Sequence, residues 1–322
     1  MNTRPRPQEP GRILVIRGGA LGDFILTLPV LAALRRQFPG VQLELLAYPQ
    51  FAVVALQGRL ADQIHPIESR ALAGFFARNG VLDAGLSAFF GRYHVILSFL
   101  YDPDEIFRNN LARVTPAQVI QGPHRPKESS PQHAAQQLLV SLERLGIFDA
   151  DCSPSLLKPE QSALRNCLVA HPGSGSESKN WPEPAWTAFL STWLETEHRS
   201  ILLVGGEAEG DRLSRLASGL PPDRVEIARS LPLDVLAQRI SLCRGFIGHD
   251  SGISHLAAAC GLPGLVLWGP SNPLVWRPIS QRFELLVAQP GLSQLTVQTV
   301  MDRLKSLWLQ WATSAEAGIS PT

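Results

Sequence analysis

Short apolar runs alternate with longer amphipathic stretches along the chain, and this alternation constrains the fold more than any other feature. Apolar runs of about four to eight residues are typical of strands buried on both faces, and the stretches between them are typical of covering helices. Such alternation predicts a largely parallel sheet, and here an α/β protein of two αβα halves. Strands are predicted at 12–17, 41–48 and 93–99, then at 167–173, 200–206, 245–250 and 263–269, with the first helix at 23–38.

Chain length and local composition place the boundary between the halves. A chain of 322 residues, 45% of them hydrophobic, exceeds one typical domain and can bury two cores. Residues 147–166 are rich in proline and small polar residues, which is typical of a linker. We therefore predict an N-terminal domain over 1–155 and a C-terminal domain over 156–322. An amphipathic helix within 292–312 packs back on a domain through Leu295, Val300, Leu304, Leu307, Trp308 and Trp311.

Charge and hydropathy exclude several classes of partner. A formal charge of +1 and a pI near 7.8 provide no surface of one sign for a nucleic acid or a polybasic membrane anchor. The polar, proline-rich start does not resemble a signal peptide, and no run of about 18 apolar residues occurs. Four widely spaced cysteines form no disulfide framework. The expected location is cytoplasmic, with at most peripheral contact with the inner membrane.

The turn after the first strand, "VIRGGALGDF", is rich in glycine but carries a carboxylate. A dinucleotide-binding turn needs G-x-G-x-x-G and an acidic residue about 20 positions later, whereas here Asp23 follows Gly22 at once. That carboxylate would repel a pyrophosphate on the same helix end. The first domain is therefore not expected to hold phosphates, and Asp23 is either a helix cap or a group that reacts.

A better phosphate site follows the strand at 245–250, in "GHDSGISHLAAACGLPGLVLWGPSNP". Asp250, Ser251 and Gly252 lead into a helix that is expected to begin near Ile253. The N–H groups and the positive end of this helix can bind a diphosphate, and His255 in the first turn can donate to it. The alternative is that Asp250 or Ser251 is only an N-cap and that His255 is a surface residue.

A second loop of small residues follows the strand at 167–173, in "VAHPGSGSESKNWPEPAW". Ser174 and Ser176 offer hydroxyls, and Lys179 is one of only four lysines in the chain. Contact with phosphate or with a leaving group is the functional interpretation of this lysine. A solvated loop lysine is the alternative.

Three stretches together resemble glycosyltransferase family 9, whose best-known members are the ADP-heptose:lipopolysaccharide heptosyltransferases. They are "RGGALGDFILTLPVLAALRRQFPG", "HPGSGSESKNWPEPAW" and "HDSGISHLAAACGLPGLVLWGPSNPLVW", in the order and spacing of the family. The resemblance implies the GT-B fold, with two Rossmann-like domains facing each other across a cleft. It implies an acceptor on the N-terminal domain, a nucleotide sugar on the C-terminal domain, and inverting transfer, most simply of heptose from ADP-heptose to a hydroxyl of a lipopolysaccharide core or related glycan.

The same resemblance assigns roles to individual residues. Asp23 is implied as the general base, while Lys179 and His255 stabilise the departing diphosphate with the N–H groups of Ser251 and Gly252. Asp250 faces the sugar or ribose. Glu209 matches the acidic position aimed at the ribose, and Glu207 is the alternative. The interval from His171 to Lys179 is a residue longer than in the best-known members, which leaves the roles of Ser174 and Ser176 open.

This scheme requires no metal ion, because cationic side chains and a helix end replace it. The D-x-D sequences at 102–104 and 149–151 are interpreted as turns. Two rival functions remain open: a nucleotide-sugar epimerase of the same architecture, which the "ALGD" turn disfavours, and a non-catalytic nucleotide-sugar binding protein. The candidates for binding the phosphates or carboxylates of an anionic acceptor are Arg108, Arg113, His124, Arg125 and Lys127.

Overall fold

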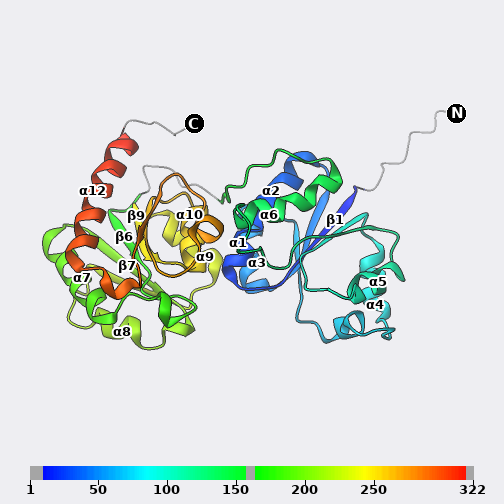
Figure 1. The fold of residues 1–322 in the computed structure, drawn as a ribbon, viewed down its shortest axis with the longest axis horizontal. Helices are drawn as coiled ribbons and strands as arrows, with labels where there is room; N and C mark the ends of the chain where they lie inside the picture. Colours follow the sequence, from blue (N-terminus) through cyan, green and yellow to red (C-terminus); the bar gives the residue numbers. More distant parts are fainter. Residues whose placement is uncertain (1–9, 157–163, 317–322) are drawn as a thin grey trace. The chain divides into compact units, whose positions relative to one another are not determined.

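A computed structural model describes residues 10–156 and 164–316, which form two compact α/β units (Figure 1). The N-terminal unit contains the chain up to Gly19, Thr27–Lys127 and Ala134–Cys152. The C-terminal unit contains Ala20–Leu26, Glu128–His133 and the chain from Ser153 onward. Of the predicted linker at 147–166, residues 157–163 lie outside the described residues.

The N-terminal unit is built on a five-stranded parallel sheet with the order β3-β2-β1-β4-β5. Its central strand β1 is buried along five of its six residues, as the apolar run predicts. Helices and 3-10 turns cover the sheet. The strands are β1 (Arg12–Arg17), β2 (Gln42–Ala47), β3 (Gln63–Pro66), β4 (Val95–Ser98) and β5 (Gln118–Gln121); the helices are α2 (Leu28–Gln37), α3 (Pro49–Gln57), α4 (Ala84–Gly91), α5 (Ile106–Ala112) and α6 (Ala134–Leu139), with 3-10 turns η1 (Arg70–Phe76) and η2 (Val140–Leu145).

The single helix predicted at 23–38 is two helices. The short α1 (Leu21–Ile25) ends before Leu26, and α2 begins at Leu28. Pro29 stands in the first turn of α2, where a missing N–H costs nothing, but the same residue could not continue α1 without breaking its hydrogen-bond ladder. The break lets α1 pack apart from α2, in the C-terminal unit.

The C-terminal unit is built on a six-stranded parallel sheet with the order β11-β10-β9-β6-β7-β8. Its strands are β6 (Cys167–Ala170), β7 (Ser200–Gly205), β8 (Val225–Arg229), β9 (Gly245–His249), β10 (Gly264–Trp268) and β11 (Phe283–Val287). Its helices are α7 (Glu183–Thr196), α8 (Arg212–Ala217), α9 (Leu233–Ser241), α10 (Gly252–Ala259), α11 (Pro273–Trp276) and α12 (Val297–Glu316), with 3-10 turns η4 (Glu177–Lys179), η5 (Glu207–Glu209) and η6 (Leu292–Gln294). The two αβα halves predicted from the sequence are confirmed.

The predicted C-terminal helix is α12, and it packs on α7 of the same unit (Figure 1). The rings of Trp193 and Trp308 meet edge to face with centroids 5.6 Å apart. Val300, Leu304 and Leu307 complete the buried face. The helix starts at Val297 rather than Leu292, because residues 292–294 form a separate 3-10 turn.

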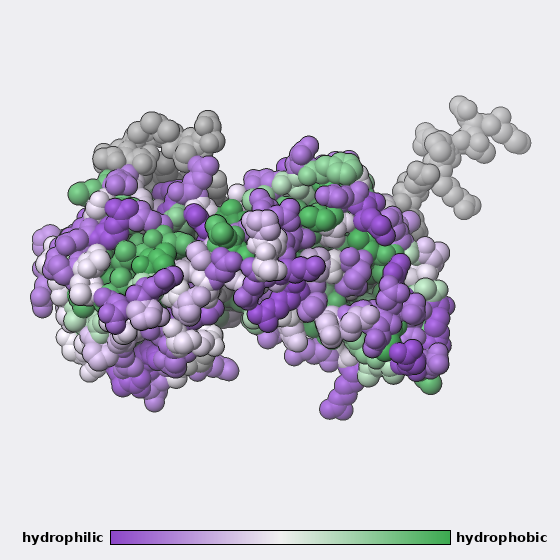
Figure 2. All heavy atoms as spheres, viewed as in Figure 1, coloured by the Kyte–Doolittle hydropathy of each residue, from purple (hydrophilic) through white to green (hydrophobic). Residues whose placement is uncertain are grey.

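Most of the surface in Figure 2 is hydrophilic, and hydrophobic residues are confined to smaller patches on each unit. Exposed large hydrophobic residues are spread over many elements, as is usual for a folded protein, and include Phe76, Val81, Phe148, Leu274 and Leu309. Within residues 10–156 and 164–316, no helix is both long and apolar enough to cross a bilayer.

Candidate functional site

The order of the strands in the C-terminal unit selects one place for a ligand. From β6 the chain runs to β7 and β8 on one side, then returns to β9 and continues to β10 and β11 on the other. The side of the sheet on which successive strands are added therefore changes between β6 and β9. In open parallel sheets, ligands bind beyond the carboxyl ends of the strands at this point of reversal. The two loops predicted to bind phosphate follow β6 and β9, so the fold brings them side by side.

The helix that follows β9 begins one residue earlier than expected, at Gly252, with Ser251 as its N-cap. The Ser251 hydroxyl accepts from the backbone N–H of Ser254, and the Ser254 hydroxyl donates to the carbonyl of His249. The first backbone N–H groups of any α-helix have no acceptor within that helix. Ser251 is thus the predicted cap, and capping leaves the positive end of α10 directed beyond the carboxyl end of β9.

Lys179 and Asp250 form an ion pair that joins the two loops. Lys179 Nζ lies 2.6 Å from Asp250 Oδ2, and the two side chains are 33% and 10% exposed. Lys179 ends the 3-10 turn η4, whereas Asp250 directly follows β9. Lys179 is therefore held by a carboxylate of the neighbouring loop, with a third of its side chain exposed.

The two predicted serine hydroxyls shape their own loop. Ser174 Oγ donates to the Ser176 carbonyl at 2.7 Å and accepts from the Ser176 N–H at 3.2 Å. Ser176 Oγ lies 2.9 Å from Ser178 Oγ. These bonds give the loop a defined shape beside Lys179.

Glu209 and Glu207 differ clearly in their exposure to solvent. Glu207 is exposed, whereas Glu209 is buried and accepts from the Gly206 N–H at 2.6 Å. Its carboxylate stands directly over Gly173, and a Cβ at that position would overlap it. Glu209 therefore faces the loop that follows β6, and the absence of a side chain at Gly173 makes room for it.

His255 is buried rather than at the surface, so that part of the alternative interpretation is wrong. Burial lowers its pKa to about 4; the negative charges of Asp250 and Asp23 oppose this shift, and His133 reinforces it. The imidazole is neutral at pH 7. Its Nδ1 is buried and has no hydrogen-bond partner among the described residues.

Asp23 belongs to the C-terminal unit, on the short helix α1. It accepts from the Ala20 N–H at 3.0 Å, so it does act as a cap for α1. Helix α1 contacts α10, and the approach is so close that a Cβ on Gly252 would lie 2.9 Å from the Gly22 nitrogen. Asp23 therefore both caps α1 and lies close enough to His255 for its charge to act on that imidazole.

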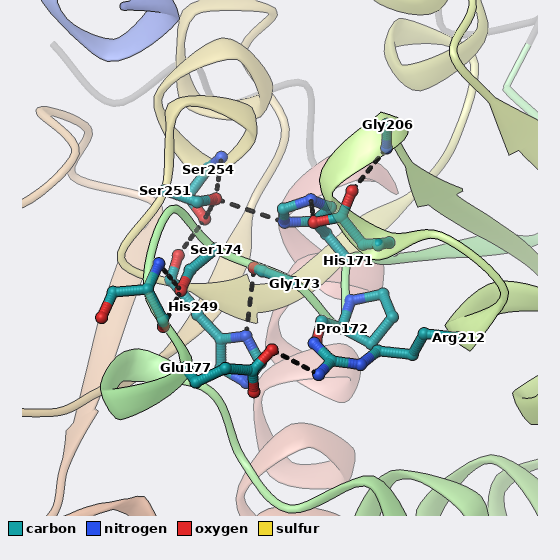
Figure 3. Close-up of polar contacts among 12 residues, drawn as sticks. His171, Pro172, Gly173, Ser174, Glu177, Gly206, Arg212, His249, Ser251 and Ser254 are labelled. Carbon is teal, nitrogen blue, oxygen red and sulfur yellow. Dashed lines mark hydrogen bonds and ion pairs between the residues drawn. The ribbon is translucent and has the colours of Figure 1, made fainter.

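Sequence reasoning missed three residues of this site, which Figure 3 shows among its polar contacts. His171 Nδ1 lies 3.2 Å from Ser251 Oγ, and burial lowers the pKa of His171 to about 3. Arg212 donates to Glu177 Oε1 at 2.7 Å and to the Pro172 carbonyl at 3.5 Å, which braces the loop after β6. His249 is buried at the end of β9. For the two histidines the sequence offers one signal, a histidine at the end of the apolar runs of β6 and β9, and it offers none for Arg212.

The acceptor candidates lie in the N-terminal unit and are not gathered into one cluster. Arg108 pairs with Glu105 at 2.7 Å, and Arg113 donates to the Gly80 carbonyl. A cavity of about 430 Å³ beside β5 is lined in part by Arg108. His124, Arg125 and Lys127 are exposed on the segment that follows β5.

The two D-x-D sequences show no metal-binding arrangement in the described residues. Asp102 accepts from the N–H groups of Phe107 and Arg108, both at 3.0 Å, and so caps the start of α5. Residues 149–151 lie in neither helix nor strand. Across 10–156 and 164–316, no three His, Cys, Asp or Glu side chains form a group that could hold a metal ion.

Comparison with known proteins identifies the family. Residues 130–304 match the model of glycosyltransferase family 9 (heptosyltransferase). The chain is 30% identical to lipopolysaccharide heptosyltransferase 1 of Pseudomonas aeruginosa over 290 residues, or 81% of this chain and 79% of that protein.

Two solved structures share the fold. The Escherichia coli heptosyltransferase WaaC with ADP has a TM-score of 0.71 at 19% identity, over 92% of this chain and 99% of that chain. The E. coli ADP-heptose lipopolysaccharide heptosyltransferase II has a TM-score of 0.74 at 17% identity, over 93% and 99%. The predicted GT-B fold is confirmed. The chain belongs to glycosyltransferase family 9 and is a glycosyltransferase.

Proposed function

We propose that this glycosyltransferase transfers heptose from ADP-heptose to a hydroxyl of a lipopolysaccharide core or related glycan, with inversion at the anomeric carbon. The observation that carries the proposal is the 30% identity with a lipopolysaccharide heptosyltransferase over most of both chains. The predicted contact with the cytoplasmic face of the inner membrane belongs to the same proposal, because the glycan acceptor is the only expected link to a membrane.

The donor diphosphate binds at the N-terminus of α10 in this proposal. The N–H groups of Ser251 and Gly252 point toward its oxygens, and Lys179 supplies the positive charge. Because Lys179 already contacts Asp250, the phosphate shares the ammonium group with this carboxylate. The neutral imidazole of His255 contributes a hydrogen bond rather than a full charge.

The remaining predicted donor contacts surround this helix end. Glu209 receives the ribose hydroxyls, Asp250 faces the sugar or ribose, and the loop carrying Ser174 and Ser176 borders the diphosphate. The burial of Glu209 supports its choice over the exposed Glu207.

Asp23 acts as the general base in this proposal. It takes the proton of the acceptor hydroxyl while that oxygen attacks the anomeric carbon, and the bond to the diphosphate breaks on the opposite side. The electron pair of that bond leaves with ADP, whose charge Lys179 and the helix end stabilise. No metal ion takes part in this scheme.

A thermal-shift panel tests the donor. ADP, UDP, GDP and dTDP are added separately, each with and without EDTA. The proposal expects the largest rise in melting temperature with ADP and no loss with EDTA, since bound ligand stabilises the folded state. Equal shifts from all four nucleotides contradict the choice of ADP, and a shift abolished by EDTA contradicts metal independence.

A further inference from the structure

We propose that His249 is a positioning residue that fixes both ends of the loop Gly173–Trp181 and thereby places Lys179 for the donor diphosphate. This inference rests on the proposed role of Lys179. His249 itself does not touch the donor in this account, and it acts only through the loop.

The imidazole of His249 bonds to both ends of the loop. At one end, the ring Nδ1 lies 3.2 Å from the Gly173 carbonyl oxygen. At the other end, Nε2 accepts from the backbone N–H of Trp181 at 2.9 Å and from the indole N–H of Trp186 at 3.3 Å. A single side chain thus spans the base of the loop that carries Lys179.

These partners determine the tautomer of His249. The two groups at Nε2 are N–H donors and cannot accept, so Nε2 carries the lone pair. The proton must be on Nδ1, which donates to the Gly173 carbonyl. Burial lowers the pKa of His249 to about 4, so this neutral form persists at pH 7. Every polar atom of the ring is used, which fixes its orientation.

The position of His249 in the chain links its hydrogen bonds to the loop with the ion pair of Lys179 and Asp250. His249 is the last residue of β9, and Asp250, the partner of Lys179, is the next residue. The same strand end therefore presents the ring that holds the loop and the carboxylate that meets its lysine. Between its ends the loop is largely exposed, and Arg212 braces its middle through Glu177.

Contacts that do not involve His249 also hold Trp181, so the role of the imidazole can be tested by substitution. The Trp181 indole donates to the Leu295 carbonyl at 3.0 Å, and its ring is buried. Trp181 therefore keeps these contacts when His249 is changed. What His249 alone supplies is the link from Trp181 to Gly173.

Two substitutions divide the functions of the ring. His249→Gln places an amide oxygen near the position of Nε2 and retains an acceptor for Trp181, but it removes the donor to Gly173. His249→Asn places an amide N–H near Nδ1 and does the reverse. Each variant is combined with Lys179→Ala in a double-mutant cycle on kcat/KM for the donor.

The cycle distinguishes positioning from general structural damage. We expect His249→Gln to lower kcat/KM about 10-fold in the wild-type background and less than about 2-fold once Lys179 is absent. An equal loss in both backgrounds overturns the proposal, as does an unchanged kcat/KM in the single variant. If His249→Gln does not fold, kcat/KM is measured for the same cycle built with His249→Asn.

A second readout does not depend on the reaction. An amine-reactive acylating reagent is applied to the full-length wild type and to each His249 variant. The rate of acylation of Lys179 is compared by mass spectrometry with the rate of acylation of exposed Lys127. Loss of the His249 brace is expected to raise the ratio several-fold, and an unchanged ratio overturns the proposal. If the wild-type protein transfers no heptose but the His249 variants show the expected rise in the acylation ratio, the proposed function is contradicted and the positioning role of His249 is not.

Discussion

Lys179 Nζ lies 2.6 Å from Asp250 Oδ2, so the loops that follow β6 and β9 meet through opposite charges at the point where the strand order reverses. A carboxylate beside the lysine holds it in place before any ligand arrives. A diphosphate adds further negative charge to the same ammonium group, and the N-terminus of α10 offsets the resulting repulsion.

Lys179→Ala is expected to lower kcat/KM for the donor by about 10²–10³-fold, which is typical of losing one group that stabilises developing charge. Initial rates over a range of donor concentrations measure this. Lys305→Ala, on α12, is the matched control and is expected to retain the wild-type rate. A full rate in Lys179→Ala would remove this lysine from the site.

Gly173→Ala probes the placement of Glu209. The new methyl group would overlap the Glu209 carboxylate, which has to move away from its position. If that carboxylate binds ribose hydroxyls, the Kd for ADP rises about 10-fold, the value of a hydrogen bond to a charged group. Calorimetric titration with ADP measures the change.

Gly175→Ala is the control for this prediction, since a Cβ there meets no atom within 4 Å. Its affinity for ADP is expected to equal that of the wild type. In a Glu209→Ala background, Gly173→Ala should add nothing further. An additional loss there would show that the methyl group acts on something other than Glu209.

Three buried neutral histidines predict a loss of stability in mild acid. Burial lowers the pKa of His171 to about 3 and those of His249 and His255 to about 4, from an ordinary value of 6.5. Between pH 6.5 and 4 the unfolded chain therefore binds more protons than the folded protein. The free energy of unfolding falls as pH drops through this window, by up to about 1.4 kcal/mol per pH unit for each histidine.

Urea denaturation at pH 7, 6 and 5 measures this dependence. His255→Gln removes one of the three titrating groups, so its free energy of unfolding should fall less steeply with acid than that of the wild type. The slope is the informative quantity, because the substitution also changes stability at pH 7. A slope identical to the wild type would mean that His255 is not a buried neutral histidine in solution.

The central strands could be predicted from the sequence, but the edge strands could not. β1, β6, β9 and β10 are buried along most of their length and form continuous apolar runs. The missed strands β3, β5, β8 and β11 are all sheet edges with half-exposed residues, so their apolar signal is weak. Burial on both faces is what makes a strand recognisable in one sequence.

The site was predictable only where a residue stands in a motif. Asp250 and Ser251 directly follow the apolar run of β9, and Lys179 stands in the Gly/Ser loop after β6 and pairs with Asp250 in the structure. The hydrogen bonds of His171 and His249 depend on β6 lying beside β9, and strand order cannot be derived from periodicity. The catalytic and binding roles of the predicted residues remain predictions.

Asp23→Asn tests the general base. Asparagine caps a helix about as well as aspartate, so the bond from the Ala20 N–H and the melting temperature should be retained. Turnover is nevertheless expected to fall by about 10²–10⁴-fold, the usual contribution of a positioned base, with ADP affinity nearly unchanged. A near-normal initial rate would leave Asp23 with its capping role alone.

The most direct test of heptosyl transfer is a single product measurement. Purified enzyme is incubated with ADP-heptose and a truncated lipopolysaccharide core that lacks heptose, in EDTA, and the acceptor is analysed by mass spectrometry. The account predicts that the acceptor gains the mass of one heptose residue, that ADP release depends on the acceptor, and that UDP-glucose gives no product. An unmodified acceptor with ADP-heptose, together with product from UDP-glucose, would contradict it.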